Sequence, residues 1–264
     1  MLYLAACSST VWRDPVTATP TDSGNITQFL LQQIRRAKEL RLAHAARPEG
    51  AAQRLLLREW QARRLARTHE DLLRHPEYRA AAEFFLSDLY GLQDTTKRDV
   101  ELERIYPIMA KMLPATGLHS VGLAVELDAL SEELDAKLLD VLVQQLGLRD
   151  AITEDAYVEA YRRCDNYALR RHQIELVRNV GDDLALLIGK PMVYMVLHAM
   201  RAPARVAGFG ELQDFLERGF SAFRKMSDAR PFLDAIQMRE MQILERIQAG
   251  HPRPFDLDAP TLQP

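Results

Sequence analysis

Apolar residues recur at spacings of three and four along most of the chain, which is the pattern of helices that bury one face. The longest such pattern runs from Thr116 to Leu146 and ends at Gly147. No segment shows the alternation of apolar and polar residues that is typical of a half-buried strand. The pattern therefore predicts a single all-α domain of about nine to eleven helices, packed around this long central helix.

Local composition sets the predicted boundaries. Residues 1–24 end in a stretch rich in Thr, Pro, Ser and Gly and are predicted to be a flexible lead-in, residues 25–250 to form the helical domain, and residues 251–264 to be a loose tail. A helix is predicted from Thr153 to Asn179, closed by Gly181. After Pro191, the run from Met192 to Leu197 leaves a helix no polar face, so we expect this helix to be buried on all sides.

The densest local signals lie in residues 81–114. Phe84 and Phe85 belong to the apolar face of a short helix, and Gly91 follows that helix at the position of a left-handed cap. Asp94 and Thr95 can cap the next helix, inside which a proline stands at position 107. That proline is expected to kink the helix or to begin a second short one.

The motif FFLSDLYG in this stretch is followed by Arg98 and Asp99, by YP, by LP and then by AVELDALSEELD. With these features the chain resembles a family of uncharacterised bacterial proteins that carry an FFL-x-DLYG signature, over residues from about Phe29 to about Ile247. The family has no assigned activity. The resemblance therefore implies no catalytic residue, cofactor or partner.

Composition and charge exclude several classes. The two cysteines, Cys7 and Cys164, form no disulfide framework or zinc motif, so a cytoplasmic location is predicted. Lipidation at the LAAC of residues 4–7 would require a start upstream of Met1. Residues 35–79 hold 12 Lys/Arg against 6 Asp/Glu. These basic residues are interleaved with glutamates and no helix-turn-helix follows, so no nucleic-acid partner is expected, and no stretch is apolar enough to span a membrane.

Two polar stripes are candidate metal sites. On the long helix, His119, Glu126 and Glu133 lie on one face, but roughly 10 Å separates each from the next, so one metal ion would need ligands from other helices. On the next helix, His172 and Glu175 are one turn apart, where they can act together or form a surface pair beside Arg170 and Arg171. The alternative for all of these groups is an ordinary solvated or helix-pairing role.

A third candidate site lies in the apolar helix after Pro191. His198 has Tyr194 one turn before it and Arg201 about one turn after it, which would suit a cofactor such as haem. A core histidine bonded to a backbone carbonyl would give the same pattern. Glu240 lies between Ile236 and Ile243, so it either pairs with a buried arginine or lies at the edge of the apolar stripe.

Two functional hypotheses follow. The chain lacks the phosphate-loop, dinucleotide, zinc-protease and serine-hydrolase motifs. We therefore favour a non-enzymatic binding or regulatory module that meets a protein partner or a second copy of itself. The alternative is a metal- or haem-binding helical protein, such as an oxidoreductase, in which the polar stripes converge on His172 or His198.

Overall fold

The computed structural model describes residues 23–45, 50–89, 96–112 and 115–257. Within these ranges every regular element is helical and no strand occurs, which confirms the predicted all-α class. The elements are α1 (Ser23–Ala45), α2 (Ala51–Thr68), α3 (Glu70–Arg74), α4 (Arg79–Phe84), η2 (Phe85–Leu89), α5 (Thr96–Met112), α6 (Ala115–Asp140), η3 (Val141–Gln145), α7 (Glu154–Cys164), α8 (Tyr167–Ile188), α9 (Pro191–Ala199), α10 (Arg201–Val206), α11 (Gly210–Phe223) and α12 (Arg230–Gln248), where η marks a π-helical segment.

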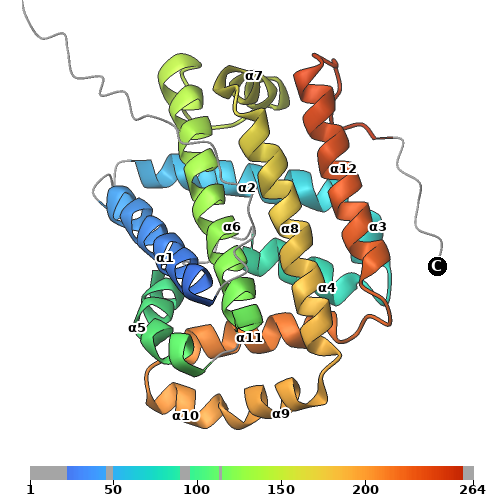
Figure 1. The fold of residues 1–264 in the computed structure, drawn as a ribbon. Helices are drawn as coiled ribbons and strands as arrows, with labels where there is room; N and C mark the ends of the chain where they lie inside the picture. Colours follow the sequence, from blue (N-terminus) through green and yellow to red (C-terminus); the bar gives the residue numbers. More distant parts are fainter. Residues whose placement is uncertain (1–22, 46–49, 90–95, 113–114, 258–264) are drawn as a thin grey trace, which may run out of the picture.

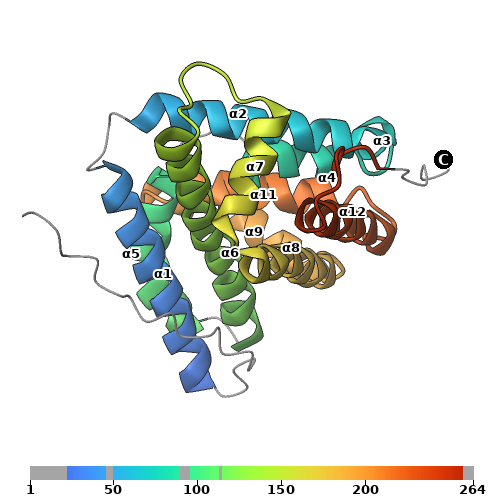
Figure 2. The same ribbon diagram turned by 90° about the horizontal axis from the view of Figure 1, so that it is seen from above.

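The helices form two layers. In the front layer α1, α6, α8 and α12 lie side by side in that order, and α2, α4 and α11 cross behind them (Figures 1 and 2). α9 and α10 lie along the lower edge in Figure 1, where they pack on α11. The main apolar core lies between the layers and joins leucines of α6 to side chains of α4, α8 and α12.

The long helix predicted at the centre of the fold is confirmed. α6 and η3 together run from Ala115 to Gln145, and Gly147 follows with φ of +68°, a backbone angle that glycine adopts without strain. Leu130, Leu134 and Leu138 are almost fully buried along this helix. The spacing of its leucines therefore identified both its length and its buried face.

The helix predicted from Thr153 to Asn179 is divided in two. Asp165 has a left-handed φ of +46° and closes α7, after which α8 begins at Tyr167. α8 then continues through Gly181, which had been expected to end it. A Cβ atom at Gly181 would lie 2.3 Å from a methyl carbon of Leu233, so this glycine allows α12 to pack closely against α8.

In the stretch at residues 81–114, α4 continues into η2 as far as Leu89. Pro107 lies inside α5, which runs as one helix from Thr96 to Met112, so this proline does not begin a second helix. The predicted cap at Asp94 and Thr95 lies outside the described residues.

Two buried ion pairs connect α12 to the rear layer. Nη1 of Arg64 on α2 donates to the two carboxylate oxygens of Glu240 at 2.6 and 2.7 Å, and Nε2 of His69 lies 3.0 Å from one of them. Arg239, only 2% exposed, donates two hydrogen bonds of 2.6 Å to Asp71. Glu240 therefore pairs with a buried arginine, as one of the two interpretations of the sequence required.

Candidate protein-docking surface

One side of α9 forms an exposed apolar stripe. Met192 is 70% exposed, Met195 61% and Val196 55%, and Ala199 continues the same helical face. We call these four residues the outer stripe. The prediction that this helix is buried on all sides is therefore wrong, because no residue of α9 is buried and only its opposite side contacts the domain.

Tyr194 lies on the side of α9 that faces the domain. Its ring stacks with that of Phe220 on α11 at 6.0 Å, and the guanidinium carbon of Arg224 lies 4.3 Å from its centroid. Val193 and Leu197 are half-buried on the same helix. α9 is therefore apolar on both sides, with one side held by α11 and the other open to solvent.

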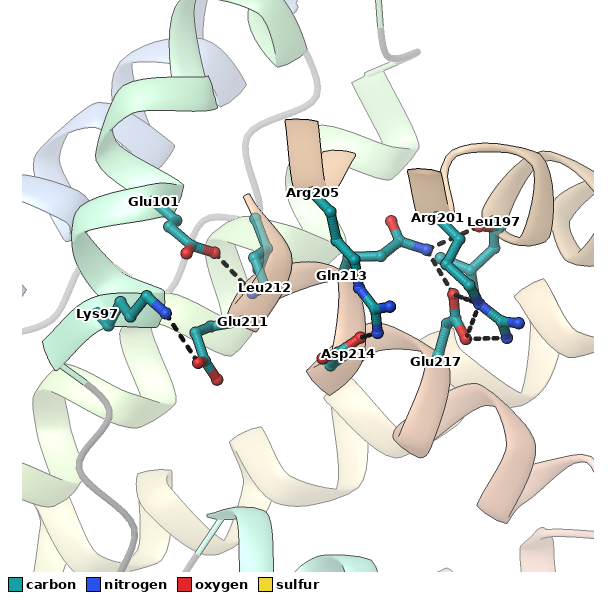
Figure 3. Close-up of polar contacts among 10 residues, drawn as sticks. All are labelled: Lys97, Glu101, Leu197, Arg201, Arg205, Glu211, Leu212, Gln213, Asp214 and Glu217. Carbon is teal, nitrogen blue, oxygen red and sulfur yellow. Dashed lines mark hydrogen bonds and ion pairs between the residues drawn. The ribbon is translucent and has the colours of Figure 1, made fainter. Parts of the chain in front are cut away.

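A polar network holds α9 and α10 against α11 (Figure 3). The buried Gln213 donates from Nε2 to the carbonyl oxygen of Leu197 at 2.7 Å and to Glu217 at 2.8 Å. Leu197 lies in the last turn of α9, so its carbonyl oxygen has no partner within the helix. The side chain of Gln213 satisfies this carbonyl instead. Nε of Arg201 lies 2.9 and 3.0 Å from the two oxygens of Glu217. Hydrogen bonding from Arg201 lowers the pKa of Glu217 to about 2, so this carboxylate is ionised at neutral pH.

The same network extends to α5. Glu101, 3% exposed, accepts a hydrogen bond of 2.8 Å from the backbone N–H of Leu212, one of the free donors in the first turn of α11. Lys97 pairs with Glu211 at 3.0 Å, and Arg205 of α10 pairs with Asp214 at 2.9 Å (Figure 3). α10 and α11 thus pack on α9, and α5 in turn holds the start of α11.

The three candidate cofactor residues lie in this region. His198 is exposed and stacks on Tyr194 with ring centroids 6.1 Å apart. Arg201 pairs with Glu217 instead of contacting the histidine. The structure therefore brings the rings of Tyr194 and His198 together where α9 meets α11, and it directs Arg201 to Glu217 on α11.

Of the candidate metal ligands, the structure brings two together. Nε2 of His172 on α8 lies 3.0 Å from a carboxylate oxygen of Glu126 on α6, and hydrogen bonding to this carboxylate raises the pKa of His172. Glu133 instead pairs with Arg36 and Lys137, while Glu175 is exposed. His119 lies beside the ring of Phe29. Across the described ranges no three His, Cys, Asp or Glu side chains form a group that could hold a metal ion.

Two buried residues of the polar network around α11 were missed in the sequence. Gln213 lies in an apolar helical face between Leu212 and Phe215, and Glu101 follows Val100 in a similar face. A polar residue at a core position was the available signal in both cases, because such a residue is buried only with a hydrogen-bond partner. Neither partner, the Leu197 carbonyl or the Leu212 N–H, is visible in a sequence.

The comparison with protein families decides how the chain is classified. The family model described as Domain of unknown function (DUF8198) matches residues 40–254. The chain belongs to the DUF8198 family. The matched residues of this DUF8198 chain run from the end of α1 through α12, so they include the outer stripe and its supporting network. No curated protein and no solved structure matched the chain. In the described part of the DUF8198 chain, no helix is both long and apolar enough to cross a membrane.

Proposed function

We propose that the protein is a non-enzymatic binding module that docks an amphipathic helix of a partner protein on the outer stripe of α9. The observation that carries this proposal is the exposure of Met192, Met195 and Val196 on one helical face, at positions i, i+3 and i+4. Exposed apolar residues in a contiguous group are typical of interaction sites, whereas scattered ones are not. Methionine side chains are flexible and polarizable, so they adapt to an apolar partner.

The polar network that holds α9 against α11 favours a role of the outer stripe in docking. Gln213 and Glu217 hold the end of α9 and the start of α10, so a partner would meet a surface that is already formed. A preformed surface loses less conformational entropy on binding than one that must be ordered.

The charge at the start of the stripe favours a partner over a second copy. Lys190 precedes α9 and is exposed, whereas Arg201, which follows α9, is paired with Glu217. Parallel packing of α9 on a second α9 would bring the two Lys190 residues together, which is repulsive. A partner helix with Asp or Glu at the matching end would instead pair with Lys190.

Photo-crosslinking in cells of the native host tests this function. A photoreactive residue at position 195 is expected to capture one protein through α9, and Met192→Glu in the same chain should abolish the capture. The matched control is position 238 on α12, because Met238 is also exposed, by 52%, but lies away from α9. Equal capture at both positions, or none at 195, would contradict the proposal. Dimers that dissociate in the Met195→Glu variant would identify a second copy as the occupant instead.

The second candidate function, metal or haem binding, rests on the contact between His172 and Glu126. A carboxylate that orients a histidine is a common arrangement around protein-bound metals. An absorption spectrum and elemental metal analysis of protein purified from its native host test it. A Soret band or a stoichiometric transition metal would favour this candidate over docking, whereas a colourless, metal-free protein would remove its support.

A further inference from the structure

Exposed methionines are concentrated in and directly after α9. Among the side chains that the structure describes, four methionines are exposed, and three of them, Met192, Met195 and Met200, lie in this one segment. The fourth, Met238, lies on α12 and is 52% exposed. The outer stripe therefore contains two solvent-exposed methionines one helical turn apart.

The other methionines with described side chains are shielded by the domain. Met109 packs in the apolar cluster that α5 forms with α1 and α6, and Met226 packs against the main core. Met241 on α12 is only partly exposed, and its sulfur accepts a hydrogen bond of 2.9 Å from Nη1 of Arg171. Access to solvent thus separates the two methionines of the outer stripe from these three.

The thioether sulfur of an exposed methionine can be oxidised by a dissolved peroxide. The sulfur attacks one oxygen of hydrogen peroxide, and an S–O bond forms as the O–O bond breaks. The proton of the transferred oxygen passes to the departing hydroxide, which leaves as water. The sulfur loses the two electrons that the peroxide gains, and the product is methionine sulfoxide. Because the oxidant must reach the sulfur, we expect Met192 and Met195 to react before the shielded methionines.

Oxidation would change the outer stripe and leave the core intact, because neither methionine is buried. A sulfoxide is polar, and its formation disrupts interfaces that are rich in methionine. A docked partner would have to bury the new oxygen atoms against an apolar face without hydrogen bonds, which is costly. Val196 and Ala199 have no group that peroxide oxidises, so the two methionines alone carry the change.

We propose that Met192 and Met195 form a reversible oxidation site, at which peroxide converts the outer stripe into a polar surface that releases its partner. The proposal rests on the docking function proposed above for this stripe. Enzymes that reduce methionine sulfoxide would restore the apolar surface. Docking would then depend on the oxidants around the protein as well as on its partner.

Peptide mapping by tandem mass spectrometry tests the modification on the purified full chain. During limited treatment with hydrogen peroxide, Met192 and Met195 are expected to be oxidised at least about tenfold faster than Met109 and Met226, which the domain shields. Far-ultraviolet circular dichroism should show no loss of helix at that stage. Equal rates at exposed and shielded methionines, or loss of helix with the first sulfoxides, would overturn the proposal.

Photo-crosslinking in cells of the native host tests the consequence for docking. The photoreactive residue is placed at position 199, which belongs to the outer stripe and leaves both methionines in the chain. Brief exposure to hydrogen peroxide is expected to lower capture of the partner by about tenfold or more, as burial of unpaired polar groups implies. Met192→Leu combined with Met195→Leu keeps the stripe apolar but removes both sulfur atoms, so its capture should persist after peroxide.

Met238→Leu is the matched control, because it removes an exposed methionine that lies away from α9. Capture by this variant should still fall after peroxide. Loss of capture in the double leucine variant would place the oxidised group elsewhere and overturn the proposal, as would capture that survives oxidation of both native methionines. An absence of capture in untreated cells would instead refute the docking function, and the oxidation switch with it.

Discussion

Glu240→Gln removes the carboxylate that neutralises Arg64 between α2 and α12. The two side chains are 15% and 11% exposed, and the shorter of their contacts measures 2.6 Å. Burial by itself raises the pKa of Glu240, but the charge of Arg64 and hydrogen bonding to His69 outweigh it and lower the pKa from 4.5 to about 2. A shift of this size corresponds to about 3 kcal/mol. Removing one partner of a buried pair costs about 3–5 kcal/mol, because the other charge stays buried and unpaired.

Urea unfolding at pH 7, followed by far-ultraviolet circular dichroism, measures this loss. Glu70→Gln is the matched control, because Glu70 pairs with Arg74 on the surface, where the two side chains are 58% and 74% exposed. That control should lose less than about 0.5 kcal/mol. The double variant Arg64→Met with Glu240→Leu should recover much of the loss, since neither charge then remains. A loss below about 1 kcal/mol in Glu240→Gln would refute the reasoning that this pair is buried and tightly coupled.

The pH dependence gives a second readout of the same pair. The pKa of Glu240 is lower in the folded chain than in the unfolded chain, so its contribution to the free energy of unfolding is fully present above about pH 4.5. This contribution is lost as the pH falls toward 2. The difference in stability between the unmodified chain and Glu240→Gln should therefore narrow over that window.

Three further outcomes are expected. The pKa of His172, measured from its ring proton resonances, should lie above 6.5 and should return toward that value in Glu126→Gln. Because the pKa is raised in the folded chain, His172 contributes stability that is present below pH 6.5 and is lost as the pH rises through the folded pKa. An unchanged pKa in the variant would exclude the carboxylate as the cause. Gly181→Ala should destabilise the chain by about 1–3 kcal/mol in urea unfolding because of the contact with Leu233, whereas Gly189→Ala, whose nearest atom lies 3.7 Å away, should cost far less. Met195→Glu, at an exposed position, should change the free energy of unfolding by less than about 0.5 kcal/mol; a larger loss would mean that the outer stripe is covered within the chain.

The parts of the fold that depend on helical spacing were predictable from the sequence. The leucines of α6 identified the central helix, and Glu240 stood out because it lies between two isoleucines on a buried face. The break at Asp165 was not predictable, since aspartate only occasionally adopts the left-handed conformation and nothing in its neighbours requires it. Gly181 was misinterpreted because a glycine that ends a helix and one that admits a neighbouring side chain look alike in a sequence.

The candidate sites show a different limit. The apolar run from Met192 to Leu197 indicates residues that gain stability when they are buried. It does not show whether they are buried by another part of this chain. Arg170 was considered as a surface neighbour of the pair His172 and Glu175, yet it is buried against Tyr161 and the Leu134 carbonyl. Burial of a charged residue depends on partners from other helices, which residue spacing along one helix cannot provide. His172 and Glu126 do meet, because α6 and α8 pack side by side.

The continuity of α6 affects how the domain unfolds. Leu118 and Val125 pack in one apolar cluster with α1, Leu130 and Leu134 in a second with α8 and α12, and Leu138 in a third with α7. α6 therefore contributes side chains to three apolar clusters, and disruption of any one cluster would expose part of this helix. We expect the amide hydrogens in the middle of α6 to exchange with solvent only through global unfolding.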